Sequence, residues 1–451
     1  MPASKTPIFD FLKAYAEKGG SRLHMPGHKG QAFLGCEPWD ITEIAGADAL
    51  YEAGGIIAQS EAIATGLFGS ARTLFSTEGS SQCIRAMLYL LTTRTSAAAD
   101  GEKPLILAAR NVHKAFVYAA ALLDVQVEWL WPEGDCRSLC SCRISPEMLE
   151  HKLQSLGRRP AGVYVTSPDY LGGMADIREL ARVCHKYGTL LAVDNAHGAY
   201  LRFLSPSRHP MDLGADLCCD SAHKTLPVLT GGAYLHIAAS APASFVAQAK
   251  QALELFGSTS PSYLILASLD RCNRYLSEGY EDRLATACGQ IQALRRSLTE
   301  HGWHLESTDP LRLTIEAPDG LSGLQLAEKL RQNAVECEYA DPEYVVLMAT
   351  PENTPEDFRK IHDALGENRL PYREKAFLPP AVAESACSIR QALFAPHETL
   401  PAEKALGRVC AAPAVSCPPA IPIAVPGEVI NEKALALFRH YGFAAVETLC
   451  R

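Results

Sequence analysis

The sequence predicts an α/β fold with a mostly parallel sheet, followed by a smaller α+β domain. From about Leu105 onward, short runs rich in β-branched and apolar residues alternate with helical stretches near 146–156 and 176–187. The runs are apolar nearly throughout, which is typical of parallel strands that helices cover on both faces. They are PLILAAR, VQVEWLW, AGVYVTSP, LLAVDNAH, DLCCDSAH and GAYLHIA. We therefore expect a doubly wound sheet.

Composition excludes several other classes. The 451 residues are 47% hydrophobic and 21% charged, which is typical of a folded globular protein and not of a disordered or fibrous chain. The formal charge of −9 disfavours nucleic acid as a partner. The apolar stretch from Ala115 to Leu123 ends at Asp124, far short of the ~20 residues that a membrane span needs.

Cysteine usage bears on the compartment. The 15 cysteines are an odd number, and residues 1–20 carry five charged side chains where a signal peptide would carry an apolar run. We expect reduced thiols and a cytoplasmic protein. Cys136, Cys140 and Cys142 are close in sequence, but their spacing matches no zinc motif, and we expect no metal.

The pattern along the chain suggests four segments. Residues 1–45 form an N-terminal arm, in which Thr6 is the expected N-cap and Pro7 the first residue of a helix. A large domain covers 46–280 and a small α+β domain covers 281–370. The small domain contains LRLTIEAP, GLQLAEKLRQNA, EYVVLMAT and PEDFRKIHDALG. Residues 371–451 are richer in proline and form a C-terminal segment.

A lysine follows one of the predicted strands. The segment DSAHKTLPVLTGG places Ser221, His223 and Lys224 directly after an apolar run. A lysine at the carboxyl end of a strand is partly desolvated, which lowers its pKa and favours Schiff-base chemistry. Taken alone, Lys224 is better explained as a surface lysine.

A carboxylate follows another strand. The segment LLAVDNAHG runs directly into Asp194, with Ala196 and His197 next to it. Asp194 either bonds the protonated nitrogen of a heteroaromatic ring or caps the next helix. Because 30 residues separate it from Lys224, enough for one helix and one strand, both side chains are expected at the same edge of the sheet.

Two further groups suit a phosphorylated, planar cofactor. Gly79, Ser80 and Ser81 precede an amphipathic helix, so their backbone amides and hydroxyls could bind a phosphate. An ordinary helix with a serine N-cap would have the same sequence pattern. His113 follows a strand and has the shape to stack on a ring, or it is a structural histidine. An amine, a carboxylate, a phosphate cup and a stacking imidazole are together the requirements of pyridoxal 5'-phosphate (PLP). The sequence has no GxGxxG, GxSxG or HExxH motif that would indicate a nicotinamide dehydrogenase, a serine hydrolase or a zinc enzyme.

The chain resembles the fold-type I PLP decarboxylases of ornithine, lysine and arginine, in the shorter bacterial form without an N-terminal wing domain. The resemblance spans nearly the whole sequence through HMPGHKG (24–30), DITEIAGADAL (40–50), the GSS cup, RNVHKA, TSPDYLGG, VDNAHGA, SAHKTLP, STSPSYLILASLD (258–270) and PPAIPIAVPGE (418–428). It implies a PLP-dependent transferase-like large domain and decarboxylation of a basic amino acid to an amine, a reaction of polyamine biosynthesis. Arginine is slightly favoured over lysine or ornithine.

The resemblance also implies roles for individual residues. Lys224 would form the Schiff base with PLP, Asp194 would contact the pyridine nitrogen and His113 would stack on the ring, so these three are the expected catalytic residues. The remaining expected cofactor contacts are Gly79, Ser80, Ser81, Ala196, His197, Ser221 and His223. In similar enzymes the segment that matches Ser258, Thr259 and Ser260 reaches the phosphate of the neighbouring subunit, which implies at least a homodimer.

Four positions depart from the family pattern. The family usually has an acidic residue at Asn195, threonine at Asp169, tyrosine at Cys417 and glycine at Ala420. These departures leave the choice of substrate open. Asp169 either faces a distal substrate cation or belongs to a turn after Pro168.

Two other functions use the same residues. An aminotransferase or lyase of this fold would hold the substrate carboxylate in plane with an arginine, for which Arg312 and Arg390 are candidates. A non-catalytic paralogue that regulates a partner by hetero-oligomerisation would keep the fold without the reaction.

Overall fold

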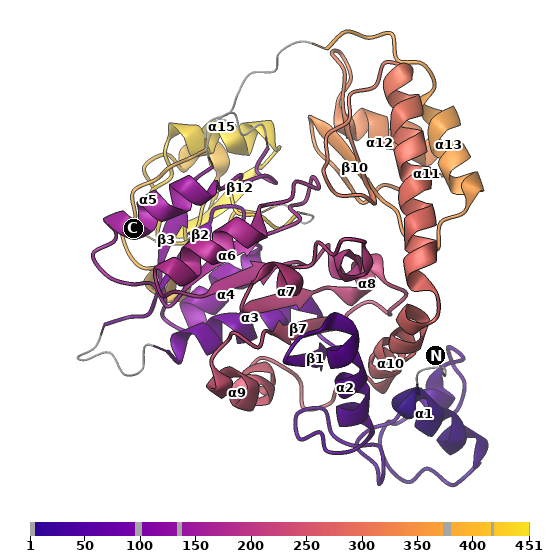
Figure 1. Ribbon diagram of the computed structural model, residues 1–451. Coiled ribbons are helices and arrows are strands. Elements are labelled where there is room, and N and C mark those ends of the chain that lie inside the picture. The colour runs from indigo at the N-terminus through magenta and orange to yellow at the C-terminus, as the bar shows by residue number, and fades with distance from the viewer. Residues whose placement is uncertain (1–4, 95–101, 133–137, 373–379, 416–418, 451) are drawn as a thin grey trace. The chain divides into compact units, whose positions relative to one another are not determined.

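A computed structural model describes residues 5–94, 102–132, 138–372, 380–415 and 419–450 (Figure 1). The chain divides into two compact units, which are described separately. The first comprises Met1–Ala97 and Ile177–Asp282, and the second comprises Ala98–Asp176 and Arg283–Arg451.

The first unit contains four strands in the order β1-β7-β6-β5. Strands β5 and β6 are parallel, whereas β6–β7 and β1–β7 are antiparallel. The strands are β1 (Arg72–Ser76), β5 (Leu191–Asp194), β6 (Leu217–Asp220) and β7 (Ala233–Ile237). The expectation of a parallel partner was therefore wrong for β7. Its connection to β6 holds only the four-residue helix α8 (Ala222–Thr225) and no crossover helix, which is what a parallel strand would need.

The helices of the first unit cover these strands. Their bounds are α1 (Pro7–Glu17), η1 (Glu37–Trp39), α2 (Ile56–Phe68), α3 (Gly79–Thr92), α6 (Ile177–Lys186), η2 (Ala199–Phe203), α7 (Pro210–Leu213), α9 (Ala243–Glu254) and α10 (Tyr263–Ser277). Helix α1 begins at Pro7 as expected, but the Thr6 side chain does not cap it. The buried Asp270 carboxylate of α10 accepts hydrogen bonds from the backbone N–H groups of Ile8 (3.0 Å) and Phe9 (2.9 Å) instead.

The second unit contains a parallel group of strands in the order β4-β2-β3, an antiparallel group in the order β8-β10-β9 and the antiparallel pair β11-β12. The strands are β2 (Leu105–Ala109), β3 (Gln126–Leu130), β4 (Gly162–Thr166), β8 (Arg312–Glu316), β9 (Tyr339–Ala340), β10 (Tyr344–Met348), β11 (His397–Pro401) and β12 (Ala445–Leu449). Strands β2, β3 and β4, together with β5, β6 and β7 of the first unit, confirm all six expected strands.

Helices complete the second unit. They are α4 (Lys114–Leu122), α5 (Pro146–Ser155), α11 (Tyr280–Glu300, most of it in this unit), α12 (Gly323–Gln332), α13 (Pro355–Leu365), α14 (Ile389–Phe394), η3 (Ala402–Lys404) and α15 (Glu432–His440). Helices α11, α12 and α13 pack on β8 and β10 around Trp303, Leu313, Val345 and Phe358. This is the α+β arrangement that the C-terminal half of the sequence predicts.

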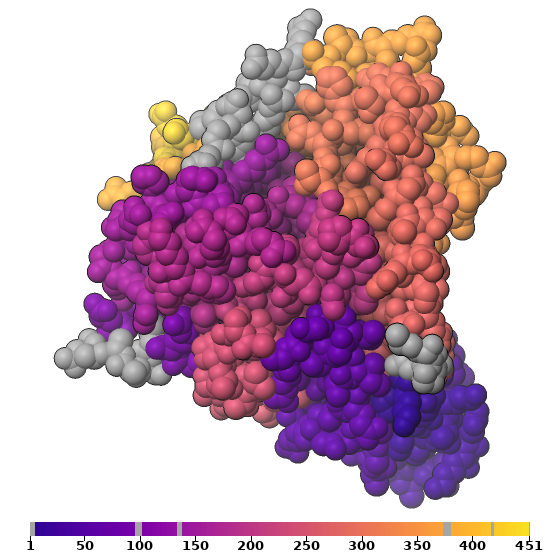
Figure 2. All heavy atoms as spheres, in the orientation of Figure 1, coloured from indigo at the N-terminus to yellow at the C-terminus, as the bar shows by residue number. Residues whose placement is uncertain are grey.

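The N-terminal segment between α1 and α2 lies on the surface, where Figure 2 shows the start of the chain in dark indigo. Leu23 is 95% exposed and Leu34 is 89% exposed. Among the described residues, none of the helices combines the length and the apolar character of a membrane span. The thirteen cysteines in the described ranges are free thiols, and Cys136 and Cys417 lie outside those ranges.

Candidate active site

Lys224 lies in α8, directly after β6, and its amine contacts an imidazole. The Nζ atom of Lys224 is 2.8 Å from Nε2 of His197. His197 lies on the turn after β5 and is only 6% exposed. The contact arises because β5 and β6 run parallel, with Asp194 opposite Cys219, so that the carboxyl ends of both strands meet. A buried imidazole beside a lysine amine provides a partner that exchanges a proton with it.

Asp194 lies at the end of β5 and is 2% exposed. Its Oδ1 atom accepts a hydrogen bond from the N–H of Ala196 (3.2 Å) and one from the thiol of Cys219 (3.7 Å). The next helix, η2, begins after Gly198 and has no side-chain cap. The interpretation of Asp194 as a helix cap is therefore wrong, and its carboxylate belongs to the same pair of strand ends as Lys224.

The GSS segment forms the first turn of α3. Gly79 has φ +70°, and a Cβ built there would meet no atom within 4 Å, so the cup is open on that side. The helix has no side-chain N-cap, so the serine-capped alternative is wrong. Ser221 donates a hydrogen bond to Ser80 across 2.8 Å, which joins the cup to the segment that carries Lys224. Ser81 follows in the same turn.

Three more of the expected cofactor contacts lie in the first unit. His223 donates from Nδ1 to the carbonyl of Gly232 (3.0 Å), which fixes the orientation of its ring. The carboxylate of Glu78 accepts a hydrogen bond from the backbone N–H of Ser258, so it ties the 258–260 segment to the start of α3. Thr259 and Ser260 are exposed in the single chain.

His113 lies in the second unit. It is the N-cap of α4, and its Nδ1 atom accepts a hydrogen bond from the N–H of Ala115 (3.1 Å). This contact leaves Nε2 as the protonated ring nitrogen. The stacking role of His113 stays a prediction.

The two arginines of the aminotransferase alternative make structural contacts. Arg312 is 1% exposed, donates to the backbone carbonyls of Asp169 and Tyr170, and lies 3.4 Å from the Asp309 carboxylate. Arg390 donates to the carbonyl of Ala121 at the end of α4 (3.0 Å). Apart from the ion pair with Asp309, Nε and Nη2 of the buried Arg312 have no hydrogen-bond partner among the described residues, and Arg390 is exposed.

Asp169 is a turn residue. Its Oδ1 atom accepts a hydrogen bond from the N–H of Gly173 (2.7 Å), and its own N–H donates to the carbonyl of Gly173 (2.8 Å). Burial raises the pKa of Asp169 to about 6, against the opposing effect of the Gly173 hydrogen bond. The turn interpretation accounts for all of these contacts.

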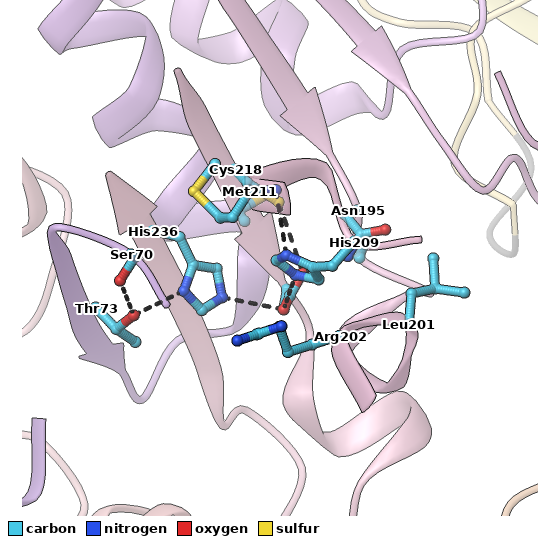
Figure 3. Close-up of polar contacts among 12 residues, drawn as sticks. Ser70, Thr73, Asn195, Leu201, Arg202, His209, Met211, Cys218 and His236 are labelled. Atoms are coloured by element: carbon cyan, nitrogen blue, oxygen red, sulfur yellow. Dashed lines mark hydrogen bonds and ion pairs between the residues drawn. The ribbon is translucent and has the colours of Figure 1, made fainter. Parts of the chain in front are cut away.

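No local sequence pattern singles out Asp220, the residue before Ser221. Its carboxylate accepts hydrogen bonds from Nε2 of His209 and Nε2 of His236, each 3.0 Å away. Figure 3 shows both imidazoles directed at the same oxygen. The only sequence signal is an aspartate that ends an apolar strand, because its histidines come from other elements.

Comparisons with known proteins agree on one family. Residues 6–352 match the family model "Orn/Lys/Arg decarboxylase, major domain", and residues 372–446 match "Orn/Lys/Arg decarboxylase, C-terminal domain". The chain is 29% identical to the arginine decarboxylase of Bacillus subtilis (strain 168) over 470 residues, which cover 97% of this chain and 93% of that protein.

Solved structures share the fold. The Francisella novicida lysine decarboxylase has a TM-score of 0.80 at 18% identity, over 99% of this chain and 81% of that chain. A structure of SPT with PLP has a TM-score of 0.56 at 15% identity, over 80% of this chain and 82% of that chain. These similarities confirm the α/β, PLP-dependent transferase-like fold that the sequence predicts. The family models span most of the chain, and the protein belongs to the Orn/Lys/Arg decarboxylase family of enzymes.

Proposed function

We propose that this protein is a PLP-dependent decarboxylase of a basic L-amino acid. The observation that carries the proposal is the 2.8 Å contact between Lys224 and His197 at the strand end that also holds the buried Asp194. Family membership supports the reaction class.

The residues present fit PLP. The phosphate would take the first turn of α3, where Gly79 leaves open space and the hydroxyls of Ser80 and Ser221 meet. The Asp194 carboxylate would bind the pyridine nitrogen, and the Lys224 amine would bind the aldehyde carbon. Ser81, Ala196 and His223 border the same groups. When bound, PLP supplies a protonated ring that accepts the electron pair left behind as CO2 departs.

The protein's own groups would bind, orient and transfer protons. The buried carboxylate of Asp194 would keep the ring nitrogen protonated. His197 would accept a proton from Lys224 at Nζ, which frees the amine to bind the aldehyde. Lys224 would border the face of the ring from which CO2 departs, and the resemblance to the family assigns the stacking position to His113.

We also propose that the active unit is a homodimer in the cytoplasm. Thr259 and Ser260 are exposed and anchored beside the cup through Glu78, which suits a segment that reaches the phosphate of a neighbouring subunit. The free cysteines are consistent with a reducing compartment. The amine product would enter polyamine biosynthesis.

Arginine is the favoured substrate, because relatives over nearly the full length are named arginine decarboxylase. The test supplies arginine, lysine and ornithine separately with PLP and measures both CO2 release and the amine formed. We expect the highest kcat/KM with arginine, giving agmatine. Formation of an α-keto acid without amine would contradict the decarboxylase proposal. Absence of any turnover, in a protein that binds PLP through Lys224, would favour the regulatory paralogue.

A further inference from the structure

Asp220 is a fully buried carboxylate that accepts hydrogen bonds from two imidazoles, one amide and the thiol of Cys218. Its Oδ2 atom accepts hydrogen bonds from Nε2 of His209 and Nε2 of His236. Its Oδ1 atom accepts one from Nδ2 of Asn195 (2.6 Å). All four side chains have 0% exposure. Burial raises the pKa of Asp220, but the two imidazoles that face its carboxylate lower that pKa to well below its usual range. The carboxylate is therefore ionised.

The orientation of the donors is fixed from outside the cluster. Nδ1 of His209 accepts the N–H of Met211 (3.3 Å), so the proton of His209 is on Nε2 and points at Asp220. Burial lowers the pKa of His236, against the raising effect of the neighbouring Asp220 carboxylate. On its other side, Nδ1 of His236 lies 2.8 Å from the hydroxyl of Thr73, which in turn lies 2.7 Å from the hydroxyl of Ser70. Figure 3 shows this chain of contacts.

The same atoms do not suit a metal ion. His209, Cys218 and Asp220 place one ligand atom each within 4.8 Å of one another. However, Nε2 of His209 carries the proton that it donates, and burial raises the pKa of the Cys218 thiol well above its usual range. A metal would require both groups to lose their protons. The hydrogen-bonded network accounts for the cluster without it.

Asn195 connects this network to the candidate active site. It lies between Asp194 and His197, on the turn after β5. Its backbone N–H donates to the carbonyl of Cys219 (3.0 Å), and its carbonyl accepts the N–H of Gly198 (2.8 Å). A Cβ on Gly198 would come within 2.1 Å of Oδ1 of Asn195, so the turn is closed tightly around this side chain. The bond from Asn195 to Asp220 thus fixes turn 194–198 on β6.

We propose that Asp220 is a positioning residue: through Asn195 it holds turn 194–198, and with it the Asp194 carboxylate and the His197 imidazole, in the geometry that receives PLP at Lys224. The inference rests on the proposed function. It also explains a departure from the family pattern, because position 195 usually carries the acid. In this chain the acid is Asp220 on β6 and its amide partner is Asn195 on the turn, so the pair holds a single negative charge.

The test uses charge exchange within the pair. Asn195→Asp places two carboxylates at the 2.6 Å contact. Asp220→Asn removes the negative charge to which both histidines and Asn195 donate hydrogen bonds. Each single variant should weaken PLP binding by about tenfold, and the double variant Asn195→Asp/Asp220→Asn should recover most of that loss, because contacting residues are strongly coupled. PLP affinity is measured by titrating the apo-protein and following the absorbance of the bound cofactor. A KM-against-kcat comparison on the loaded enzyme accompanies it.

Asp216→Asn is the matched control. Asp216 is buried at the other end of β6 and accepts hydrogen bonds from Nε2 of His185, the N–H of Leu191 and the hydroxyl of Ser240, but it has no contact with turn 194–198. We expect it to lower the unfolding temperature of the apo-protein without changing PLP affinity. Asn195→Ala, which keeps Asp220 and both histidines, provides a second variant if Asp220→Asn fails to fold.

Three outcomes would overturn the inference. They are an unchanged PLP affinity in Asp220→Asn and Asn195→Ala, a double variant no better than the single variants, or an Asp216→Asn variant that loses PLP affinity to the same extent. The first two leave the proposed function intact. Failure of the wild-type protein to bind PLP would contradict the proposed function, and this inference with it.

Discussion

At the scale of single residues, Asp194 has the environment of a charge-bearing group and not of a structural cap. It is buried, and its Oδ1 atom accepts the N–H of Ala196 and the thiol of Cys219. We predict that Asp194→Asn lowers kcat about a hundredfold, because the variant cannot stabilise positive charge on the ring nitrogen. Steady-state kinetics with saturating PLP measures this. A kcat within a factor of two of wild type would remove Asp194 from the proposed site.

Ala420 occupies a backbone conformation that suits glycine. Its φ is +60°, and its carbonyl accepts the N–H of Lys114 at the start of α4 (2.9 Å). The left-handed region costs a residue with a Cβ about 1–2 kcal/mol. Position 420 therefore carries alanine in place of the family's glycine but keeps the backbone conformation that glycine favours.

Ala420→Gly should accordingly raise the free energy of unfolding by about 1 kcal/mol, since the positive φ then carries no penalty. Ala285→Gly, at an exposed position in the interior of α11, is the control and should lower it by about 1 kcal/mol. Urea unfolding compares the two. The same sign of change in both variants would contradict the prediction.

At the scale of elements, α1 depends on a residue that is distant in sequence. Asp270 on α10 accepts the N–H groups of Ile8 and Phe9 and the hydroxyl of Ser60 (2.6 Å). We predict that Asp270→Ala lowers the free energy of unfolding by about 2–3 kcal/mol, because three donors lose their acceptor. A loss below 0.5 kcal/mol, on the order expected of an exposed surface substitution, would contradict this assignment.

The same carboxyl gives a pH dependence. Burial raises the pKa of Asp270 to about 6, from 3.8 for an ordinary aspartate. The folded protein therefore holds a proton that the unfolded chain has released, so this group's contribution to stability falls as pH rises from about 4 to about 6 and is constant above that. Asparagine does not titrate, so the Asp270→Asn variant does not lose stability through this group as pH rises. The stability advantage of wild type over Asp270→Asn should shrink across that window, and an advantage that grows would reverse the assigned sign.

Elements also show where sequence reasoning succeeds. Strand β5, which ends at Asp194, and strand β6, which precedes the Lys224 segment, were predictable, because each is a local apolar run that ends in a polar residue. The cap of α1 was not, because Asp270 lies 262 positions from Ile8. The Asp220 network was missed for the same reason: His209 and His236 are 11 and 16 positions away and come from different elements. Contacts made across the fold have no local pattern.

At the scale of the whole molecule, the proposed homodimer predicts that two inactive variants complement each other. Each site would take Lys224 from one subunit and Thr259 and Ser260 from the other. A Lys224→Ala subunit paired with a Thr259→Arg/Ser260→Arg subunit forms one intact site and one doubly damaged site. Random reassortment of an equal mixture should restore about a quarter of wild-type activity. No recovery, after subunit exchange has been verified, would show that each site is built within one chain.

The central claim is that Lys224 is the residue that holds PLP. Reduction of the PLP-loaded protein with sodium borohydride, followed by peptide mass spectrometry, tests it most directly. The account predicts a single phosphopyridoxyl adduct, on the Nζ atom of Lys224, that disappears in Lys224→Ala and persists in a control that lacks the exposed Lys13. An adduct on another lysine, or none at saturating PLP, would contradict the account.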